Sequence, residues 1–353
     1  MSKEVMIKDA ASLLASAPQH PKPFIADDGN AYALVYNGKG DRGDISSYEQ
    51  VPVNNASLRY DEWRRLDDSV QRVAEYQLVG IKDLREQGLV YPLGNAMGTT
   101  VLTWETMSDM GEAITSIDPI RRGVSDAPDF ETKHLPIPVT YMDYQIGERY
   151  LQESRNRGNP ISTINAERAA RKVNEALENM LFGEKAVKTY GGGTIDTYLS
   201  FSGTNTVDLD AAWDASGVTG EDIKDNILEM VQESINYKFM GPWMVYVPTA
   251  YQTKLGDDYS VSGASKMTIQ QRVEAIEGII KIKVAHSLPA DTVLLVQMTP
   301  DVVELVDGLP IQNVQWNTEG GFMHYYKVLT IQVPRLKADY NGNTGIVKLI
   351  NVA

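Results

Sequence analysis

The sequence predicts an α+β fold in which long extended arms accompany a folded body. A strongly patterned amphipathic helix spans 163–182, and short strands fill most of the chain after residue 279. Two segments, 1–59 and 99–144, are long and extended but have little in their own sequence to bury both faces. With 42% hydrophobic and 23% charged residues, a packed core is expected, not disorder or a coiled coil.

Charge and cysteine content exclude several classes of function. The 353 residues include 33 Lys and Arg against 47 Asp and Glu, a formal net charge of −14, which disfavours tight sequence-independent binding to DNA phosphates. There is no cysteine, so disulfides, thiolate zinc sites and cysteine nucleophiles are excluded, and a cytoplasmic setting is the default. No segment has the apolar length of a membrane span or of a secretion signal, so neither is expected.

Residues 1–59 are interpreted as an N-terminal arm. They are rich in Pro, Gly, Asn and Asp, with only short apolar runs such as 32–36. A segment of this length without a core pattern is expected to become ordered only against neighbouring molecules. The triplet Arg42, Gly43 and Asp44 resembles an adhesion motif, but its chance occurrence in a polar turn is the favoured interpretation.

An amphipathic helix is predicted after this arm. Apolar residues recur at spacings of three and four from Trp63 to Leu84, and Gly88 is expected to end the helix. Two charge pairs four residues apart support its exposed face, Arg64 with Asp68 and Lys82 with Glu86.

Residues 99–144 are predicted to form a long β-arm. Its two limbs, 99–117 and 133–144, are rich in Thr, Val, Ile, Tyr and Trp, and a turn segment with Pro and Gly separates them. Arg121 and Arg122 lie in that turn. In an acidic protein they are expected to meet carboxylates of a neighbouring subunit in preference to nucleic acid.

The 163–182 helix carries its apolar residues on one stripe, and Gly183 follows as a stop signal. Glu167 is expected to pair with Arg171 on the opposite face. At about 1.5 Å per residue the helix is about 30 Å long, enough to be the backbone of a domain. Capping boxes start two later helices, Thr219 with Asp222 and Thr268 with Gln271, and a strand is predicted at 243–247.

No convergent catalytic or metal-binding group emerges, so no catalytic, cofactor-binding or metal residue is predicted. The HExxH, GxSxG and P-loop motifs are absent, and the histidines are scattered along the chain, at His20, His134, His286 and His324. Glycines 191–193 precede a predicted strand, so a hairpin tip is favoured over a phosphate cradle. A solvated acidic turn is favoured over a calcium loop at Asp208, Asp210 and Asp214, and 256–259 lacks the context of a polymerase metal motif.

The order of these segments resembles the major capsid protein of tailed phages, whose fold is shared with encapsulin shell proteins. The similarity covers about 60–350 and depends on segment order and patterning, since this family has no short diagnostic motif. The segments that carry it are 63–88, 135–144 with 165–183, 241–251 with 276–280, and 325–350.

This resemblance implies the tailed-phage capsid fold, with an N-terminal arm, an extended β-arm called the E-loop, a peripheral domain with a long spine helix, and an axial domain. The implied boundaries are 1–59 for the N-terminal arm, 60–98 for the first helix and connection of the peripheral domain, 99–144 for the E-loop, 145–218 for the peripheral domain with spine helix 163–182, 219–310 for the axial domain, and 311–353 for return strands of the peripheral domain.

The implied function is that of a structural subunit, not an enzyme, of an icosahedral virus capsid that self-assembles around packaged double-stranded DNA. It would be located in the virion capsid after assembly in the host cytoplasm. Its implied partners are further copies in pentamers and hexamers, portal, scaffold and decoration proteins, and DNA through weak non-specific contact, with no membrane and no cofactor. The candidate inter-subunit contacts are Arg121, Arg122, Trp104 and Trp63.

Two alternatives to the phage capsid remain open. The first is an encapsulin-type nanocompartment that encloses a cargo enzyme, and the second is an unrelated enzyme or adhesin. The long N-terminal arm and the long β-arm both depart from the compact encapsulins, which favours the phage capsid.

Overall fold

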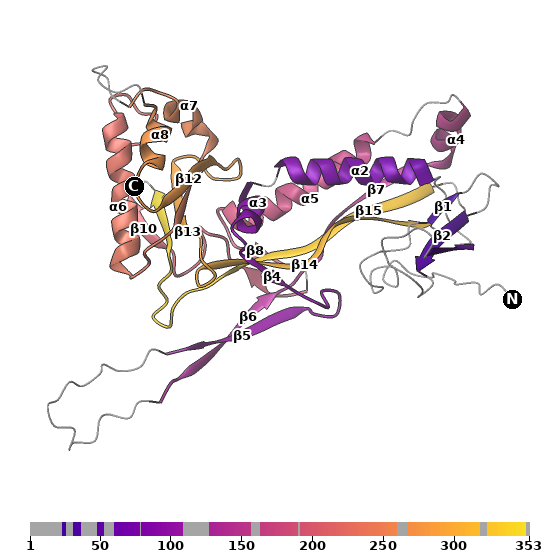
Figure 1. Cartoon of the computed structure of the whole chain (residues 1–353), viewed down its shortest axis with the longest axis horizontal. Helices are drawn as coiled ribbons and strands as arrows, with labels where there is room; N and C mark the ends of the chain where they lie inside the picture. The colour runs from indigo at the N-terminus through magenta and orange to yellow at the C-terminus, as the bar shows by residue number, and fades with distance from the viewer. Residues whose placement is uncertain are drawn as a thin grey trace.

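The computed structural model describes residues 23–25, 31–36, 48–52, 60–77, 79–108, 127–156, 163–189, 191–259, 267–317 and 323–350. His20, the Arg42 to Asp44 triplet, Arg121 and Arg122 lie outside these ranges, and so does the side chain of Trp63. Figure 1 shows an elongated subunit with two folded bodies and a two-stranded ribbon that projects from between them.

In chain order the elements are β1 (Pro23–Ile25), β2 (Ala31–Tyr36), β3 (Tyr48–Pro52), α2 (Tyr60–Gln77), α3 (Val79–Glu86), β4 (Val90–Pro92), β5 (Val101–Met107), β6 (Phe130–Pro136), β7 (Thr140–Gly147), α4 (Glu148–Asn156), α5 (Ile164–Phe182), β8 (Val187–Lys188), β9 (Thr194–Ile195), β10 (Asn205–Asp208), α6 (Gly220–Asn236), β11 (Trp243–Val247), the 3₁₀ turn η2 (Thr249–Tyr251), α7 (Gln252–Leu255), α8 (Ile269–Glu274), β12 (Ile279–Val284), β13 (Thr292–Gln297), β14 (Val303–Asn317), β15 (Met323–Leu336) and β16 (Ile346–Ile350).

The first body, which we call the spine body, is a four-stranded sheet in the order β4-β14-β15-β7 with helices on one face. β14 and β15 form a long antiparallel hairpin, β7 pairs antiparallel with β15, and β4 pairs parallel with β14. Helices α2 and α5 lie side by side over this sheet (Figure 1). The buried core between them includes Leu66, Ala170, Leu177, Tyr326 and Val328.

The second body, which we call the five-strand body, is a mixed sheet in the order β10-β16-β13-β11-β12. Its strands pair parallel at β10 with β16 and at β11 with β12, and antiparallel elsewhere. Helices α6, α7 and α8 belong to this body (Figure 1), and its core includes Trp213, Ile227, Val245, Leu295 and Leu349.

Local sequence signals are confirmed where they depend on near neighbours in the chain. Helix α5 begins and ends within one residue of the prediction, and both capping boxes form. Gly88 adopts a left-handed conformation with φ of 72° after α3, which suits a residue without a Cβ. The exposed charge pairs of Arg64 with Asp68 and Lys82 with Glu86 are both present at 3.8 Å.

Three other expectations need correction. The single helix predicted from Trp63 to Leu84 is two helices, since α2 ends at Gln77 and α3 begins at Val79. Glu167 accepts a hydrogen bond from Thr163 Oγ1 at 2.8 Å instead of pairing with Arg171. Within the predicted N-terminal arm, β1, β2 and β3 form a small antiparallel sheet whose middle strand is the apolar run at 31–36.

The β-arm is shorter than predicted because its second limb is divided. β6 pairs with β5, but β7 leaves the arm and joins β15 in the spine body. Pro136 and Pro138 stand at the division, and proline has no N–H to donate to a ladder. Ile137 between them still donates its N–H to Thr100 O at 2.8 Å, so the turn out of the ribbon is held at its base.

The C-terminal strands are also divided between the two bodies. β14 and β15 lie in the spine body as expected for return strands, but β16 lies between β10 and β13 in the five-strand body. The range 311–353 is therefore not a single return to one sheet. The last strand instead completes the other core, where Val347 and Leu349 are fully buried.

Helix α3 connects the two bodies through buried polar groups. Asp83 is fully buried, receives a hydrogen bond from Tyr246 Oη at 2.9 Å, and pairs with Lys283. Burial raises the pKa of Asp83, and the hydrogen bond from Lys283 opposes that rise. At the start of the helix, Glu178 on α5 accepts a hydrogen bond from Gly80 N–H at 3.1 Å, and burial raises the pKa of Glu178 to about 7.

Candidate inter-subunit surfaces

The β5–β6 ribbon is largely exposed to solvent. Its strands pair in register from Val101 with Pro136 to Met107 with Phe130. No residue of β5 is buried, and only Leu135 of β6 is. An isolated two-stranded ribbon is marginally stable at best in water. Contact with another molecule is therefore expected to stabilise the ribbon.

One face of the ribbon is apolar at its outer described end. In β5 every second residue from Val101 to Met107 is exposed, and the cross-strand partners of these residues share their face. Met107 and Phe130 are such a pair, and their side chains are 59% and 63% exposed. Two large exposed apolar side chains at opposite positions of a strand pair are typical of an interaction surface.

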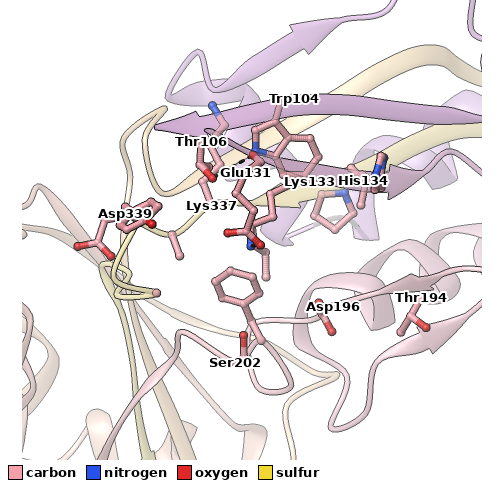
Figure 2. Close-up of a pocket in the computed structure, with 17 residues that line it drawn as sticks. Trp104, Thr106, Glu131, Lys133, His134, Thr194, Asp196, Ser202, Lys337 and Asp339 are labelled. Carbon is pink, nitrogen blue, oxygen red and sulfur yellow. Dashed lines mark hydrogen bonds and ion pairs between the residues drawn. The ribbon is translucent and has the colours of Figure 1, made fainter. Parts of the chain in front are cut away.

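The opposite face of the ribbon covers a hollow of about 270 Å³ at its base. Figure 2 shows Trp104 and Lys133 on the ribbon side of this hollow and Asp196 and Ser202 on the other. Two of the charged residues that line the hollow form an ion pair, Lys133 with Glu131 at 2.6 Å. Burial raises the pKa of Asp196, which a hydrogen bond from Ser200 opposes.

Trp104 is held against its own chain. The Arg335 guanidinium lies 5.5 Å from the centre of the Trp104 ring and 4.6 Å from that of Tyr91. Arg335 also forms an ion pair with Glu304. Lys337 Nζ forms a second ion pair with the same carboxylate, at 2.9 Å from Glu304 Oε2. Burial acts to raise the pKa of Glu304, but the hydrogen bonds from both cations outweigh it and lower that pKa.

The structure describes two of the four predicted contact residues, Trp104 and the backbone of Trp63. Trp104 is half-buried in the ribbon base, and Trp63 lies on α2. Arg121 and Arg122 lie outside the described residues. A role for any of the four between subunits stays a prediction.

Sequence reasoning missed several exposed apolar side chains on the described surface. On the edge strand β7, Tyr141 and Met142 are exposed, and at the end of α6 Ile235 and Met240 are exposed. Alternate residues of a strand lie on opposite faces, so the position of Met107 in β5 indicates which face of the ribbon it shares with its strand partner Phe130. The sequence alone does not say which side of a strand or helix a fold leaves uncovered.

The described residues contain no group of three or more residues that could hold a metal ion. The three described histidines lie apart: His134 is exposed on β6, His286 follows β12, and His324 is buried on β15 against Glu148. Glycines 191–193 all have positive φ in the turn between β8 and β9, so the predicted hairpin tip is confirmed. None of the described helices is long and apolar enough to cross a membrane.

The fold is that of capsid and particle-shell subunits. The structure matches a virus-like particle from Pyrococcus furiosus with a TM-score of 0.58 at 17% identity, over 82% of this chain and 98% of that one. It matches the capsid of Myoviridae Phage XM1 with a TM-score of 0.58 at 12% identity, over 76% and 90%. A native GTA particle capsid matches with a TM-score of 0.54 at 14% identity, over 76% and 90%.

The sequence itself places the chain in a family. Residues 54–349 match a family of unknown function, DUF6260, and the chain belongs to that family. A comparison with curated proteins found no match.

Proposed function

We propose that the protein is a structural subunit of an icosahedral capsid of the phage type, which self-assembles into a shell around double-stranded DNA. The observation that supports this most is the capsid fold itself, matched over three quarters or more of the chain in a phage capsid and in a particle shell. On this proposal the protein is not an enzyme, and its surfaces act by contact with further copies.

The parts of the subunit take capsid roles within this proposal. The spine body with α5 is the peripheral domain, the five-strand body is the axial domain, and the β5–β6 ribbon is the E-loop. Residues 1–59 form an arm that laces subunits together. Arg121, Arg122, Trp104 and Trp63 contact neighbouring copies, and the exposed pair of Met107 and Phe130 joins them.

The wider assembly follows from the same proposal. Copies form pentamers and hexamers, and portal, scaffold and decoration proteins complete the virion. Assembly takes place in the host cytoplasm, and the mature location is the virion capsid. The exposed ribbon and the net negative charge of the chain are compatible with these roles.

An encapsulin-type compartment is the second candidate, since the virus-like particle from Pyrococcus furiosus is covered over 98% of its chain. The length of the segment before α2 and the projecting ribbon favour the phage type. The two candidates differ in contents: a capsid takes up long double-stranded DNA, whereas a compartment takes up a protein cargo.

The deciding experiment is electron microscopy of the purified protein, combined with size-exclusion chromatography and light scattering. Closed particles, or pentamers and hexamers that convert to them, are expected. A protein that stays monomeric at high concentration under every salt and pH condition contradicts the proposal. Nuclease-protected DNA in particles from infected or lysogenic cells separates the capsid from the compartment.

A further inference from the structure

The β5–β6 ribbon meets the spine body at its base through an apolar pair. Leu102 and Leu135 are cross-strand partners, and both pack against the core of the spine body. Beside them Pro136 lies close to Gly193, where an added Cβ would come within 3.0 Å of the proline side chain. These contacts fix where the ribbon begins. Contacts at one end alone, however, leave open the angle at which a two-stranded ribbon leaves the body.

Trp104 supplies a second contact farther out along β5. It lies two residues beyond Leu102 on the same face of the strand, about 7 Å along it, and its side chain also packs against the spine-body core. Of the described apolar residues of the ribbon that do so, Trp104 is the outermost. Beyond it, Thr106 and Glu131 line the hollow (Figure 2). The direction of the ribbon therefore depends on how firmly Trp104 is held.

Arg335 holds the Trp104 ring from the side of the spine body. Its guanidinium lies over two rings, that of Trp104 on β5 and that of Tyr91 on β4. A cation is attracted to the face of an aromatic ring, and more strongly where water is excluded. The Arg335 side chain is buried, with 7% of the residue exposed. The guanidinium thus connects the ribbon to β4 and β15 of the spine-body sheet.

The guanidinium is itself fixed by the neighbouring strand β14. Glu304 is the cross-strand partner of Arg335 and forms an ion pair with it. Lys337 Nζ pairs with the same carboxylate and donates a hydrogen bond to Pro300 O at 2.7 Å. Arg335 Nε is buried and forms no hydrogen bond with a described group. One carboxylate and two ring faces therefore define the site of this guanidinium.

The angle of the ribbon decides where its exposed apolar pair lies. With about 3.3 Å per residue, Met107 is about 20 Å from Val101 along β5, so a rotation of about 10° at the base moves it by about 3 Å. Met107 and Phe130 form the exposed pair at this end. A ribbon that is already held in one direction loses less conformational freedom when it contacts another molecule.

We propose that Arg335 is a positioning residue for the ribbon, which holds Trp104 against the spine body and so fixes the direction of the ribbon before a neighbouring copy binds. The effect on assembly rests on the proposed capsid function, whereas the effect on direction does not. Because Arg335 is buried, a substitution there removes no side chain from the outer surface. Loss of the guanidinium leaves Glu304 paired with Lys337, so the subunit is expected to stay folded.

The direction of the ribbon can be measured in dissociated subunits, because the chain has no cysteine of its own. Asp129→Cys at the outer end of the ribbon and Glu175→Cys on α5, both exposed positions, carry spin labels. Double electron–electron resonance then gives the distribution of distances between the labels. The wild-type background is expected to give one narrow distribution. Arg335→Met and Trp104→Leu are each expected to broaden or shift it by about 3 Å or more, as for a rotation of about 10°.

Two controls test whether the ring and the cation carry the effect. Trp104→Phe keeps an aromatic face and is expected to keep the narrow distribution. Lys327→Met also removes a β15 cation from above an aromatic ring, since Lys327 Nζ lies 4.1 Å from the centre of the Tyr141 ring. That ring belongs to β7 and not to the ribbon, so the distribution is expected to stay unchanged. Circular dichroism melting of each variant reports whether the subunit is folded.

The inference is overturned if the wild-type distribution is as broad as those of the variants, if Trp104→Leu leaves it narrow, or if Lys327→Met broadens it as much as Arg335→Met. It is also overturned if Trp104→Phe gives a distribution as broad as that of Trp104→Leu, because an aromatic face is then not what holds the ribbon. If Arg335→Met does not fold, Trp104→Leu and Trp104→Phe decide the question.

Particle yield without spin labels is the second measurement. The yield of Arg335→Met by sedimentation is expected to fall about 5-fold or more, because a ribbon without a fixed direction has to be ordered on contact. Broad distances together with a full particle yield overturn the role in assembly. If the distances change as expected but the wild type forms no particles, the capsid proposal fails and the positioning of the ribbon by Arg335 stands.

Discussion

The five-strand body and the β5–β6 ribbon are built from similar β-forming residues, yet their burial is opposite. Every residue of β11 and of β13 is buried, whereas β5 has no buried residue at all. The central strands have sheet neighbours on both edges, and they pack against the core of their own body on one face and against the core of the spine body on the other. The ribbon strands pair only with each other, and every second residue of β5 is exposed. One region is stabilised within the subunit, and the other has surfaces that only another molecule can cover.

The largest effect is expected in the five-strand body. Leu295 on β13 is fully buried, so Leu295→Ala removes packed methyl groups and leaves a cavity. The free energy of unfolding is expected to fall by about 2–5 kcal/mol. Urea denaturation of the dissociated subunit measures this loss. A fall in the unfolding free energy of less than about 1 kcal/mol would contradict the comparison, because the core would then tolerate the lost side chain as well as an exposed ribbon does.

A pH-dependent effect of intermediate size is expected where α3 links the bodies. The folded-state pKa of Glu178 is raised to about 7 from 4.5, so its protonated form stabilises the folded chain. That contribution is complete below about pH 4.5 and is lost as the pH rises through 7, up to about 3 kcal/mol in total. Glu178→Gln keeps an acceptor for Gly80 N–H and removes the charge.

The measurement for Glu178 is the difference between wild type and variant in urea-unfolding free energy from pH 5 to pH 8. The variant is expected to be relatively more stable at pH 8, because residue 178 then has no buried carboxyl group that must ionise. Parallel pH curves for the two proteins would contradict the assignment of this titration to Glu178. Glu175→Gln on the exposed side of the same helix is the matched control.

The ribbon is expected to behave in the opposite way from the core. In the double variant Met107→Ser and Phe130→Ser, subunit stability should change by less than about 0.5 kcal/mol, since both side chains are exposed. Particle yield by sedimentation should fall about 10-fold or more, as expected for apolar anchors at an interface. Thr103→Ser and Thr132→Ser, on the same face of the ribbon, form the control. If the double variant assembles as well as the wild type, the exposed apolar pair of the ribbon is not a contact between subunits, and the proposed difference from the buried core is wrong.

The smallest effect is expected at a helix cap of the five-strand body. Thr219 caps α6 in a reciprocal pair with Asp222, and hydrogen bonds from Thr219 lower the pKa of Asp222. Thr219→Ala is expected to cost about 1 kcal/mol. Thermal unfolding of the subunit measures it, with Thr249→Ala as a control because that residue starts only a 3₁₀ turn. If the two variants lose equal stability, the capping box of Thr219 and Asp222 contributes nothing to the stability of α6.

The resemblance in the order of segments predicted the capsid fold correctly, although the similarity to solved structures is below 20% identity. The long helix, the two capping boxes and the strand at 243–247 form as predicted. The candidate contact surfaces were less predictable. The sequence indicates Trp104 as a candidate contact between subunits, but the Arg335 guanidinium from a distant part of the same chain lies over its ring. Met107 and Phe130 are more exposed, and no sequence pattern indicates them as contacts.

Features that depend on residues a few positions apart could be predicted from the amino-acid sequence. The period of apolar residues, the reciprocal caps and the left-handed Gly88 all follow from short-range geometry, so α5, α6 and the end of α3 are predictable. The absence of cysteine and the charge of −14 are likewise fixed by composition.

Which distant segments meet is settled by the tertiary fold alone. β7 leaves the arm for β15, and β16 joins the five-strand body, because strand pairing depends on partners far away in the chain. The burial of Glu178 and of Asp83 depends on how α3 fits between the two bodies, which no local pattern encodes. Burial is a property of the assembled surfaces and not of a residue type, so the same β-forming residues end in a core at β13 and in solvent at β5.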